Sequence, residues 1–350
     1  MKPVIKKVLI TGGAGLIGSS AAEYYARKGT DVIVFDNLMR SNIFGYRKKS
    51  VEYNWRYLAK YPNIKRIKGD VRNKRDLLEV ITKKVDMVIH AAGQPGVPSS
   101  VRNPELDFSI NAQGTLNVLE CLRKVSPQAT FIYCSTNKVY GENVDKTPLR
   151  ELKTRYIYKN IEGISEKTAV DKCGHTPYGV SKYVGDIYTQ EYAYLYGMKT
   201  AVFRMSCTYG PRQFGFEDQG WVAHFIISTL TNRPITIYGN GKQVRDLLYV
   251  EDLIRAFNLF AKTKTKHAVY NIGGGHGNTL SLLEFLDILR KKLDKEPKVK
   301  FARWRPSDQK VYISDISKIE NELGWSPNVS AKDGIERLIS WIKENKNLFK

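Results

Sequence analysis

The chain has 350 residues, and 56 Lys and Arg against 35 Asp and Glu give it a formal net charge of +21. Hydrophobic residues make up 42% and charged residues 26%, which excludes wholesale disorder because enough apolar surface is available to bury a core. No apolar run approaches the roughly 18–20 residues needed to cross a bilayer. The four cysteines and five histidines lack the number and spacing of a disulfide scaffold or a metal site, so we expect no metal and no membrane contact.

Lys and Arg are dispersed along the chain and form neither an arm nor a single basic helix. This pattern favours a solvated surface with a few arginines reserved for an anionic ligand, and we expect no nucleic acid as partner. A basic protein that binds RNA or serves as a redox-sensing scaffold remains the remote alternative. In the absence of recognisable membrane and export signals, we expect a cytoplasmic protein.

Short β-branched runs alternate with helical stretches over the first 205 residues. The expected strands are Val8–Thr11, Asp31–Phe35, Ile64–Lys68, Asp86–Ala91, Thr130–Ser135 and Thr200–Arg204, and the expected helices are Ser20–Lys28, Gly114–Lys124 and Ser181–Tyr196. Alternation at this spacing predicts a doubly wound α/β fold, a parallel sheet with helices on both faces.

Beyond residue 205 the loops lengthen and become richer in Gly, Pro, Arg and aromatic residues. Short strands are expected at Ile235–Tyr238 and Val269–Ile272, and Ser281 with Glu284 reads as the capping box of a helix. We expect a smaller, interleaved C-terminal substrate domain formed by residues 205–239 and 274–350. The sheet domain would take residues 1–204 and a return segment at 240–273. Residues 142–176 are polar and read as an insertion near the active site.

The segment Thr11-Gly12-Gly13-Ala14-Gly15-Leu16-Ile17-Gly18 follows the first strand and opens a helix. Glycines allow a tight turn and a close approach to a pyrophosphate, which then lies on the positive end of the helix. Asp36 ends the second strand, where its carboxylate would accept hydrogen bonds from an adenosine ribose and repel a 2′-phosphate. The pattern predicts a Rossmann-type fold that binds NAD rather than NADP, although Arg40 would tolerate a phosphate.

Two further strand ends carry polar residues. Asp70 ends the third strand, where we expect the edge of the adenine; the alternative is a helix N-cap. His90 ends the fourth strand before two alanines that would pass close under the cofactor, and we interpret His90 as structural.

Tyr178-Gly179-Val180-Ser181-Lys182 places a phenol and an ammonium four residues apart, on one face of a helix. The lysine charge should favour the phenolate, so Tyr178 would act as a general base toward a sugar hydroxyl. The cofactor-binding candidates are Gly12, Gly15, Leu16, Ile17, Gly18, Asp36, Asn37, Arg40, Asp70, Val71, Ala91, Ala92, Tyr178 and Lys182.

On these motifs the sequence resembles the extended short-chain dehydrogenase/reductase family, specifically its NAD-dependent nucleotide-sugar epimerases and dehydratases. The resemblance covers essentially the whole chain. Its further pieces are Ser135-Thr136, Val139-Tyr140-Gly141, Arg204, Tyr209-Gly210-Pro211-Arg212, Val244-Arg245-Asp246, Tyr249-Val250 with Asp252, and Leu323-Gly324-Trp325.

The resemblance implies that Thr136 completes a catalytic set with Tyr178 and Lys182. Sugar 4,6-dehydratases of the family carry Thr-Asp-Glu at this place, whereas this chain has Thr136-Asn137-Lys138, which argues against dehydration. The stretches 135–141 and 204–221 resemble the 2-epimerases of CDP-linked sugars. Cys207 replaces the Asn that helps to hold the diphosphate in 4-epimerases, and nothing near it in sequence supplies a base for a nucleophile.

The resemblance also implies cations for the substrate diphosphate, namely Arg245 and Arg305 with Arg212 nearby, while Asp308 would pair with a ribose or order an arginine. The substrate-binding candidates are Gln94, Thr136, Asn137, Cys207, Arg212, Gln213, Arg245, Arg305 and Asp308. We expect a nucleotide-diphosphate sugar as substrate and a homo-oligomer, dimer or tetramer. Epimerisation of a UDP-sugar at C4, or of another nucleotide sugar at C2, remains open.

Overall fold

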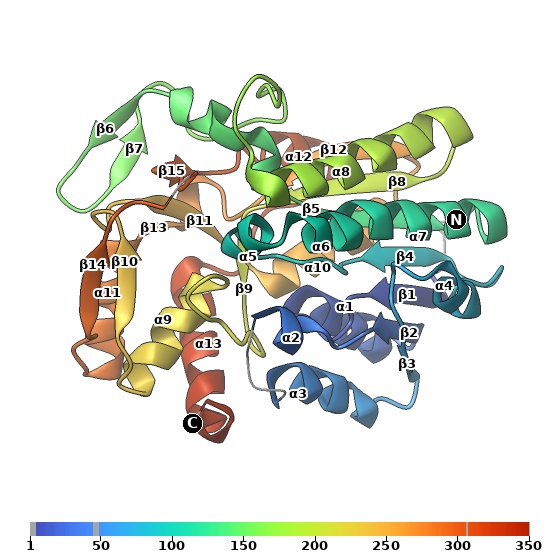
Figure 1. Cartoon of the computed structure of the whole chain (residues 1–350), viewed down its shortest axis with the longest axis horizontal. Helices are drawn as coiled ribbons and strands as arrows, with labels where there is room; N and C mark the ends of the chain where they lie inside the picture. The colour runs from blue at the N-terminus through green and yellow to red at the C-terminus, as the bar shows by residue number, and fades with distance from the viewer. Residues whose placement is uncertain (1–4, 45–48, 306, 350) are drawn as a thin grey trace. The chain divides into compact units, whose positions relative to one another are not determined.

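The computed structural model describes residues 5–44, 49–305 and 307–349. It divides into two compact units, each assembled from three separate stretches of chain (Figure 1). Unit 1 takes the chain up to Val139, Thr176–Arg204 and Ile254–Tyr270, and unit 2 takes Tyr140–His175, Met205–Leu253 and the chain from Asn271 onward. The stretch from 140 to 175 therefore belongs to unit 2 rather than to the expected sheet domain, and the return segment is shorter than 240–273.

Unit 1 is built on a seven-stranded parallel sheet with the order β12-β8-β5-β4-β1-β2-β3 (Figure 1). The strands are β1 (Lys7–Thr11), β2 (Asp31–Asp36), β3 (Ile64–Lys68), β4 (Met87–His90), β5 (Thr130–Thr136), β8 (Thr200–Met205) and β12 (His267–Ile272). Every strand expected in this region is present, with ends displaced by at most two residues. Their continuous apolar runs form strands because both faces of the sheet are covered.

One face of the sheet packs on α4 (Lys74–Val80), α7 (Gly114–Val125) and α8 (Thr176–Tyr196), where Leu9, Val88 and Phe131 share a buried cluster with residues of these helices. On the other face lie α1 (Leu16–Arg27), whose Tyr25 hydroxyl is 4.0 Å from the Met87 sulfur, and α10 (Val250–Ala261), whose Phe257 ring lies 4.8 Å from Phe203. The expected doubly wound α/β fold is confirmed. The remaining helices of unit 1 are α2 (Arg40–Phe44), α3 (Lys49–Tyr57), α5 (Val97–Arg102) and α6 (Pro104–Phe108), with short turns at Leu58–Lys60 and Ser109–Gln113.

Unit 2 carries short strands in three small sheets. In one of them β11 (Val244–Tyr249) pairs with β9 (Cys207–Tyr209), β13 (Thr279–Ser281) and β15 (Val311–Tyr312). The other two are the pair β10 (Ile235–Tyr238) with β14 (Val299–Ala302) and the hairpin β6 (Leu149–Glu151) with β7 (Tyr156–Tyr158). Its helices are α9 (Trp221–Leu230), α11 (Leu282–Leu293), α12 (Ser317–Leu323) and α13 (Ala331–Glu344), with short turns at Asn137–Lys146, His276–Asn278 and Lys346–Leu348.

The expected capping box is present at the start of α11. Glu284 N donates to Ser281 Oγ at 3.1 Å, and Ser281 N donates to Glu284 Oε2 at 3.0 Å. The same carboxylate accepts from Arg155 Nε at 2.7 Å, which ties the loop between β6 and β7 to this helix. The predicted insertion thus packs within unit 2 through a contact 129 residues apart in sequence.

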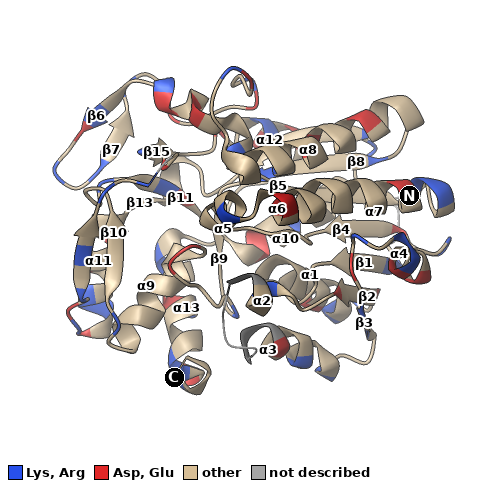
Figure 2. Ribbon diagram, viewed as in Figure 1, with Lys and Arg blue, Asp and Glu red and all other residues tan. Residues whose placement is uncertain are grey.

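Charged residues of both signs are interspersed along the helices and loops of each unit (Figure 2). Within the described residues no helix is both long enough and apolar enough to span a membrane. The same residues contain no group of three or more His, Cys, Asp or Glu placed to hold a metal ion.

Candidate cofactor and catalytic site

In the glycine-rich turn between β1 and α1, backbone segments lie too close together to admit side chains. Gly12 has φ 68°, and a Cβ placed there would lie 2.4 Å from the backbone nitrogen of Ala92. A Cβ on Gly18 would lie 2.3 Å from the carbonyl oxygen of Gly12. Helix α1 begins after Gly15 without a side-chain cap, so its first amide groups are offered to a ligand. The turn therefore has the form that a pyrophosphate requires.

Asp36 lies at the end of β2 with both carboxylate oxygens bound to backbone amides. Oδ2 accepts from Ala14 N at 2.9 Å and Oδ1 accepts from Leu38 N at 2.7 Å. Desolvation by the surrounding protein raises the pKa of Asp36. Each oxygen keeps a lone pair beyond its amide contact, so the carboxylate is oriented to accept further hydrogen bonds from hydroxyl groups.

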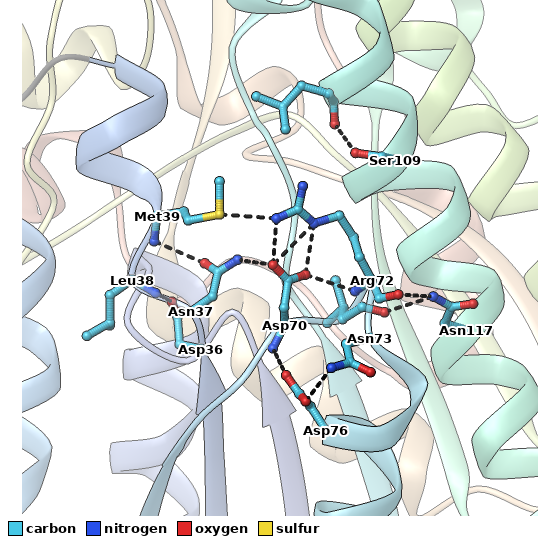
Figure 3. Close-up of polar contacts among 12 residues, drawn as sticks. Asp36, Asn37, Leu38, Met39, Asp70, Arg72, Asn73, Asp76, Ser109 and Asn117 are labelled. Atoms are coloured by element: carbon cyan, nitrogen blue, oxygen red, sulfur yellow. Dashed lines mark hydrogen bonds and ion pairs between the residues drawn. The ribbon is translucent and has the colours of Figure 1, made fainter.

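Asp70 lies at the end of the neighbouring strand β3, and it is not the N-cap of α4. The cap is Asn73, whose side chain accepts from Arg75 N. Asp70 instead binds Arg72 and Asn37, which begins the loop after β2 (Figure 3). Partial burial by itself would raise the pKa of Asp70. The hydrogen bonds from Arg72 and Asn37 and the positive charge of Arg72 outweigh burial, so the pKa is lowered.

The segment after β4 passes close to the glycine turn, as expected. Ala91 N donates to Thr11 O at 3.1 Å. His90 is fully buried between the hydroxyls of Thr11 and Thr115, at 2.6 and 3.0 Å, and burial lowers its pKa to about 3. A neutral imidazole held between two hydroxyls supports the structural role expected for His90.

Thr136, Tyr178 and Lys182 are brought together in unit 1. Thr136 ends β5 and Tyr178 lies on α8, and the Tyr133 hydroxyl of β5 donates to the Lys182 carbonyl of α8 at 3.1 Å. Lys182 follows one turn later on α8, only 6% exposed, with Nζ 4.3 Å from the centroid of the Tyr133 ring. Tyr178 and Lys182, four residues apart on α8, therefore lie on the helix that packs against the end of the central strand β5.

The protonation of this site differs from the expectation that Lys182 favours the phenolate. Desolvation raises the pKa of Tyr178 to about 12, and the negative charge of Asp107 acts in the same direction. Desolvation lowers the pKa of Lys182 to about 8. Burial thus dominates both pKa values, and near neutral pH Tyr178 is a neutral phenol while Lys182 is mostly protonated.

A buried amide network supports this site and escaped the sequence analysis. Asn111 Nδ2 donates to Asp107 Oδ1 at 3.0 Å and to Ser181 Oγ at 3.1 Å. The side chain of Gln94, predicted to bind substrate, is 2% exposed and donates to Asp107 Oδ1 at 3.1 Å. The Gln94 side chain is therefore hydrogen-bonded in the interior of unit 1. Asn111 lies in a π-helical turn, Ser109–Gln113, whose sequence carries no signal of that geometry.

The substrate-binding candidates of unit 2 lie on several elements. Cys207 is in β9, and its sulfur accepts from the indole nitrogen of Trp221 at 2.8 Å. Arg212 and Gln213 follow β9, both at most 8% exposed, and Arg212 has φ 65°. Arg245 lies on β11 and donates to the carbonyl of Val244 at 2.8 Å.

Arg305 lies against the loop that precedes α9. Its guanidinium stacks on the Tyr238 ring at 3.7 Å and approaches the carboxylates of Glu217 at 3.6 Å and Asp218 at 3.4 Å. The backbone nitrogen of Asp308 donates to the Arg305 carbonyl at 3.3 Å, and pairing of the Asp308 carboxylate with a ribose or an arginine stays a prediction. Arg245 lies on β11 and Arg305 lies in the loop after β14, a strand of a different small sheet, and their use by one ligand remains a prediction.

The sequence matches the NAD dependent epimerase/dehydratase family over residues 8–273. The chain belongs to this family. Among its relatives, CDP-paratose 2-epimerase of Salmonella typhi is 42% identical over 96% of this chain and 98% of the relative. A putative UDP-glucose 4-epimerase of Methanocaldococcus jannaschii is 34% identical over 97% and 99%. UDP-glucuronic acid 4-epimerase of Bacillus cereus, solved with UDP-glucuronic acid and NAD, superposes with a TM-score of 0.82 at 28% identity, over 97% and 99%.

Family membership confirms three predictions: the Rossmann-type fold, NAD as the cofactor and an NAD-dependent epimerase as the class of enzyme. The residues of unit 1 fit that cofactor, because Gly12 and Gly18 leave no room for side chains and Asp36 is oriented toward hydroxyl donors. The roles of individual residues are proposed below.

Proposed function

We propose that this enzyme inverts C2 of a nucleotide-diphosphate sugar, converting CDP-paratose to CDP-tyvelose through a 2-keto sugar. The observation that carries the proposal is the placement of Thr136 at the end of β5 against α8, the helix that carries Tyr178 and, one turn later, the buried Lys182. Similarity to the Salmonella typhi 2-epimerase supports the choice of carbon and nucleotide. In this proposal unit 1 holds NAD and unit 2 contributes the residues that hold the nucleotide sugar.

NAD, held by the glycine turn and Asp36, would supply the redox chemistry, namely reversible hydride transfer at C2 of the sugar. Tyr178 Oη takes the proton of the C2 hydroxyl and later gives it back, while Thr136 Oγ1 binds the same oxygen and orients it. A phenol with a pKa of about 12 needs added positive charge to act as a base. Lys182 supplies one such charge from within the site.

The residues after Thr136 favour epimerisation over dehydration. Elimination of water needs an acid and a base beside the ring, whereas this chain offers the amide of Asn137 and the ammonium of Lys138. Lys138 N and the Asn137 side chain both contact Thr136 Oγ1, at 3.3 Å. Asn137 therefore helps to orient the threonine hydroxyl, and we retain it as a substrate-side residue.

The test is a panel of CDP-, GDP- and UDP-sugars incubated with the NAD-loaded enzyme in heavy water. We expect inversion of C2 of a CDP-sugar with no deuterium at the inverted carbon, because the same hydrogen leaves and returns through the cofactor. Deuterium at that carbon would contradict the redox route, since it indicates removal of the carbon-bound hydrogen as a proton. Nuclear magnetic resonance of the product reads both the carbon and the isotope.

The second candidate is epimerisation of a UDP-sugar at C4, favoured by the similarity to the Methanocaldococcus jannaschii relative. Cys207, bound by Trp221, stands where 4-epimerases carry the Asn that helps to hold the diphosphate, and this ranks the second candidate lower. The same panel separates the two, because a C4-inverted product would appear only with UDP-sugars. A cytoplasmic location and a dimer or tetramer stay predictions, checked by fractionation and by light scattering.

Arg305→Ala is expected to raise KM for the nucleotide sugar about 10–100-fold with little change in kcat. A charge-assisted hydrogen bond to a phosphate contributes about 1.5–3 kcal/mol, equally in the ground and transition states. Steady-state kinetics measure both constants. Arg303→Ala is the matched control, because Arg303 is exposed two residues earlier. Equal KM values for the two variants would remove Arg305 from the diphosphate site.

A further inference from the structure

Asp107 of α6 is a buried carboxylate with no role in the mechanism proposed above, and it is 1% exposed. Its Oδ1 accepts from Asn111 Nδ2 at 3.0 Å and from Gln94 Nε2 at 3.1 Å. Its Oδ2 is buried and accepts no hydrogen bond from the described residues. Both donors are neutral amides, so they leave the negative charge of the carboxylate uncompensated in the protein interior.

Lys182 is a cation buried nearly as deeply. It is 6% exposed, and its Nζ lies over the ring of Tyr133. One turn further along α8, Asp186 is already paired with Arg204, whose Nε lies 2.9 Å from Asp186 Oδ2. The contacts of Asp107 within the described residues include no such arginine. Of the two carboxylates whose charges act on Lys182, Asp107 is therefore the one that is not already neutralised.

Asn111 brings the two charges close to each other. A Cβ placed on Gly93 would lie 3.0 Å from Asn111 Oδ1 and 3.9 Å from Lys182 Nζ, so the amide and the ammonium flank the same backbone position. The Asn111 nitrogen that donates to Asp107 also donates to Ser181 Oγ at 3.1 Å, and Ser181 directly precedes Lys182 on α8. Opposite charges that flank one buried side chain interact far more strongly than opposite charges on the surface.

Each of the two groups acts on the protonation of the other. Desolvation lowers the pKa of Lys182 to about 8, and negative charges that include Asp107 work against that fall. Burial raises the pKa of Asp107, and the positive charge of Lys182 works against that rise. The two groups together therefore favour a carboxylate and an ammonium over two neutral side chains.

The other titratable groups on the packed elements are neutral, paired or exposed. Burial lowers the pKa of His90 to about 3 and raises that of Cys134 to about 12, so both are neutral near neutral pH. Burial also keeps the Tyr133 phenol protonated by raising its pKa. The charged residues of the neighbouring helices are the exposed Arg102 of α5, the exposed Glu105 of α6, and Glu120 of α7, which pairs with Arg123.

We propose that Asp107 is a positioning residue of the catalytic site, whose carboxylate compensates the buried charge of Lys182 and keeps this lysine in its cationic form. The inference rests on the proposed function and deepens it, because that function needs a positive charge to help Tyr178 act as a base.

The test is the pH dependence of kcat/KM for the nucleotide sugar in Asp107→Asn. The amide keeps an oxygen for Asn111 and Gln94 and removes the negative charge. In the wild type we expect the rate to be lost as pH rises through the pKa of Lys182, about 8, because only the ammonium supports catalysis. In the variant that pKa falls, so the alkaline limb moves to lower pH by about one unit. Glu105→Gln, the matched control, removes an exposed charge from the same helix and keeps the wild-type profile.

The shape of the profile separates a role of the charge from a merely structural role. The Asp107 charge adds to burial in raising the pKa of Tyr178, so its removal moves the acid limb to lower pH as well. Limbs that stay in place, or a rate that falls by the same factor at every pH, would overturn the inference. Asp107→Ser, smaller and also neutral, should give the same shift. If neither neutral variant folds and retains NAD, Asp107 serves the fold and not the charge of Lys182, and the inference fails. A wild-type enzyme that converts no nucleotide sugar would instead overturn the proposed function.

Discussion

Replacement of Tyr178 by Phe is expected to lower turnover about 10²–10⁴-fold while the protein keeps its bound NAD. The substitution removes one oxygen, the atom that would exchange the proton with the substrate in the proposed mechanism. The glycine turn and Asp36, which we expect to hold the cofactor, are untouched. Product formation from the nucleotide sugar and the NAD released on denaturation are the two measurements.

Tyr188→Phe is the matched control for this prediction. Tyr188 lies on the same helix α8, is 40% exposed and makes a ring contact with Tyr192 that a phenylalanine preserves. We expect the wild-type rate from this variant. If Tyr178→Phe also keeps more than a tenth of the wild-type rate, the proton passes through another group and the catalytic assignment fails.

The second large effect concerns stability. Arg204→Leu is expected to lower the free energy of unfolding by about 3–5 kcal/mol, because it leaves a buried carboxylate without its charge partner. Arg204 Nε lies 2.9 Å from Asp186 Oδ2, with 7% and 0% of the two side chains exposed. Ser135 Oγ donates to the same oxygen at 2.7 Å and does not neutralise it. Urea denaturation measures the change.

Two comparisons test the cause of that loss. Arg27→Leu removes a cation that is 65% exposed from its pair with Glu23 and should cost less than about 1 kcal/mol. The double variant Asp186→Leu with Arg204→Met should recover most of the stability, since it removes both charges. A double variant as unstable as Arg204→Leu alone would show that lost packing, and not an uncompensated charge, is the cause.

The strands and the cofactor turn could be predicted because their signals are local. A continuous apolar run such as Val32-Ile33-Val34-Phe35 forms a strand covered on both faces wherever the sheet is assembled. The four glycines from Gly12 to Gly18 could be recognised from residue type alone, because only glycine lacks the Cβ that these tight positions exclude. The four-residue spacing of Tyr178 and Lys182 needs only the helix period.

Other features depended on partners distant in sequence. The segment after Tyr140 joins unit 2 through contacts such as Arg155–Glu284, which no local pattern announces. Gln94 was expected to bind substrate, and the structure shows it hydrogen-bonded to Asp107 and Asn111 in the interior. The N-cap of α4 is Asn73 because Asp70 is held by Arg72 and Asn37.

The sequence by itself determined the strands of the sheet domain, the dinucleotide turn and the pair Tyr178 and Lys182, since each is encoded in residue type and short spacing, while Thr136 followed from the resemblance to the family. The tertiary structure alone decided the protonation of Tyr178 and Lys182 and the partner of Asp70. Desolvation and hydrogen bonding depend on which groups from distant segments surround a side chain, and folding is what brings those groups together.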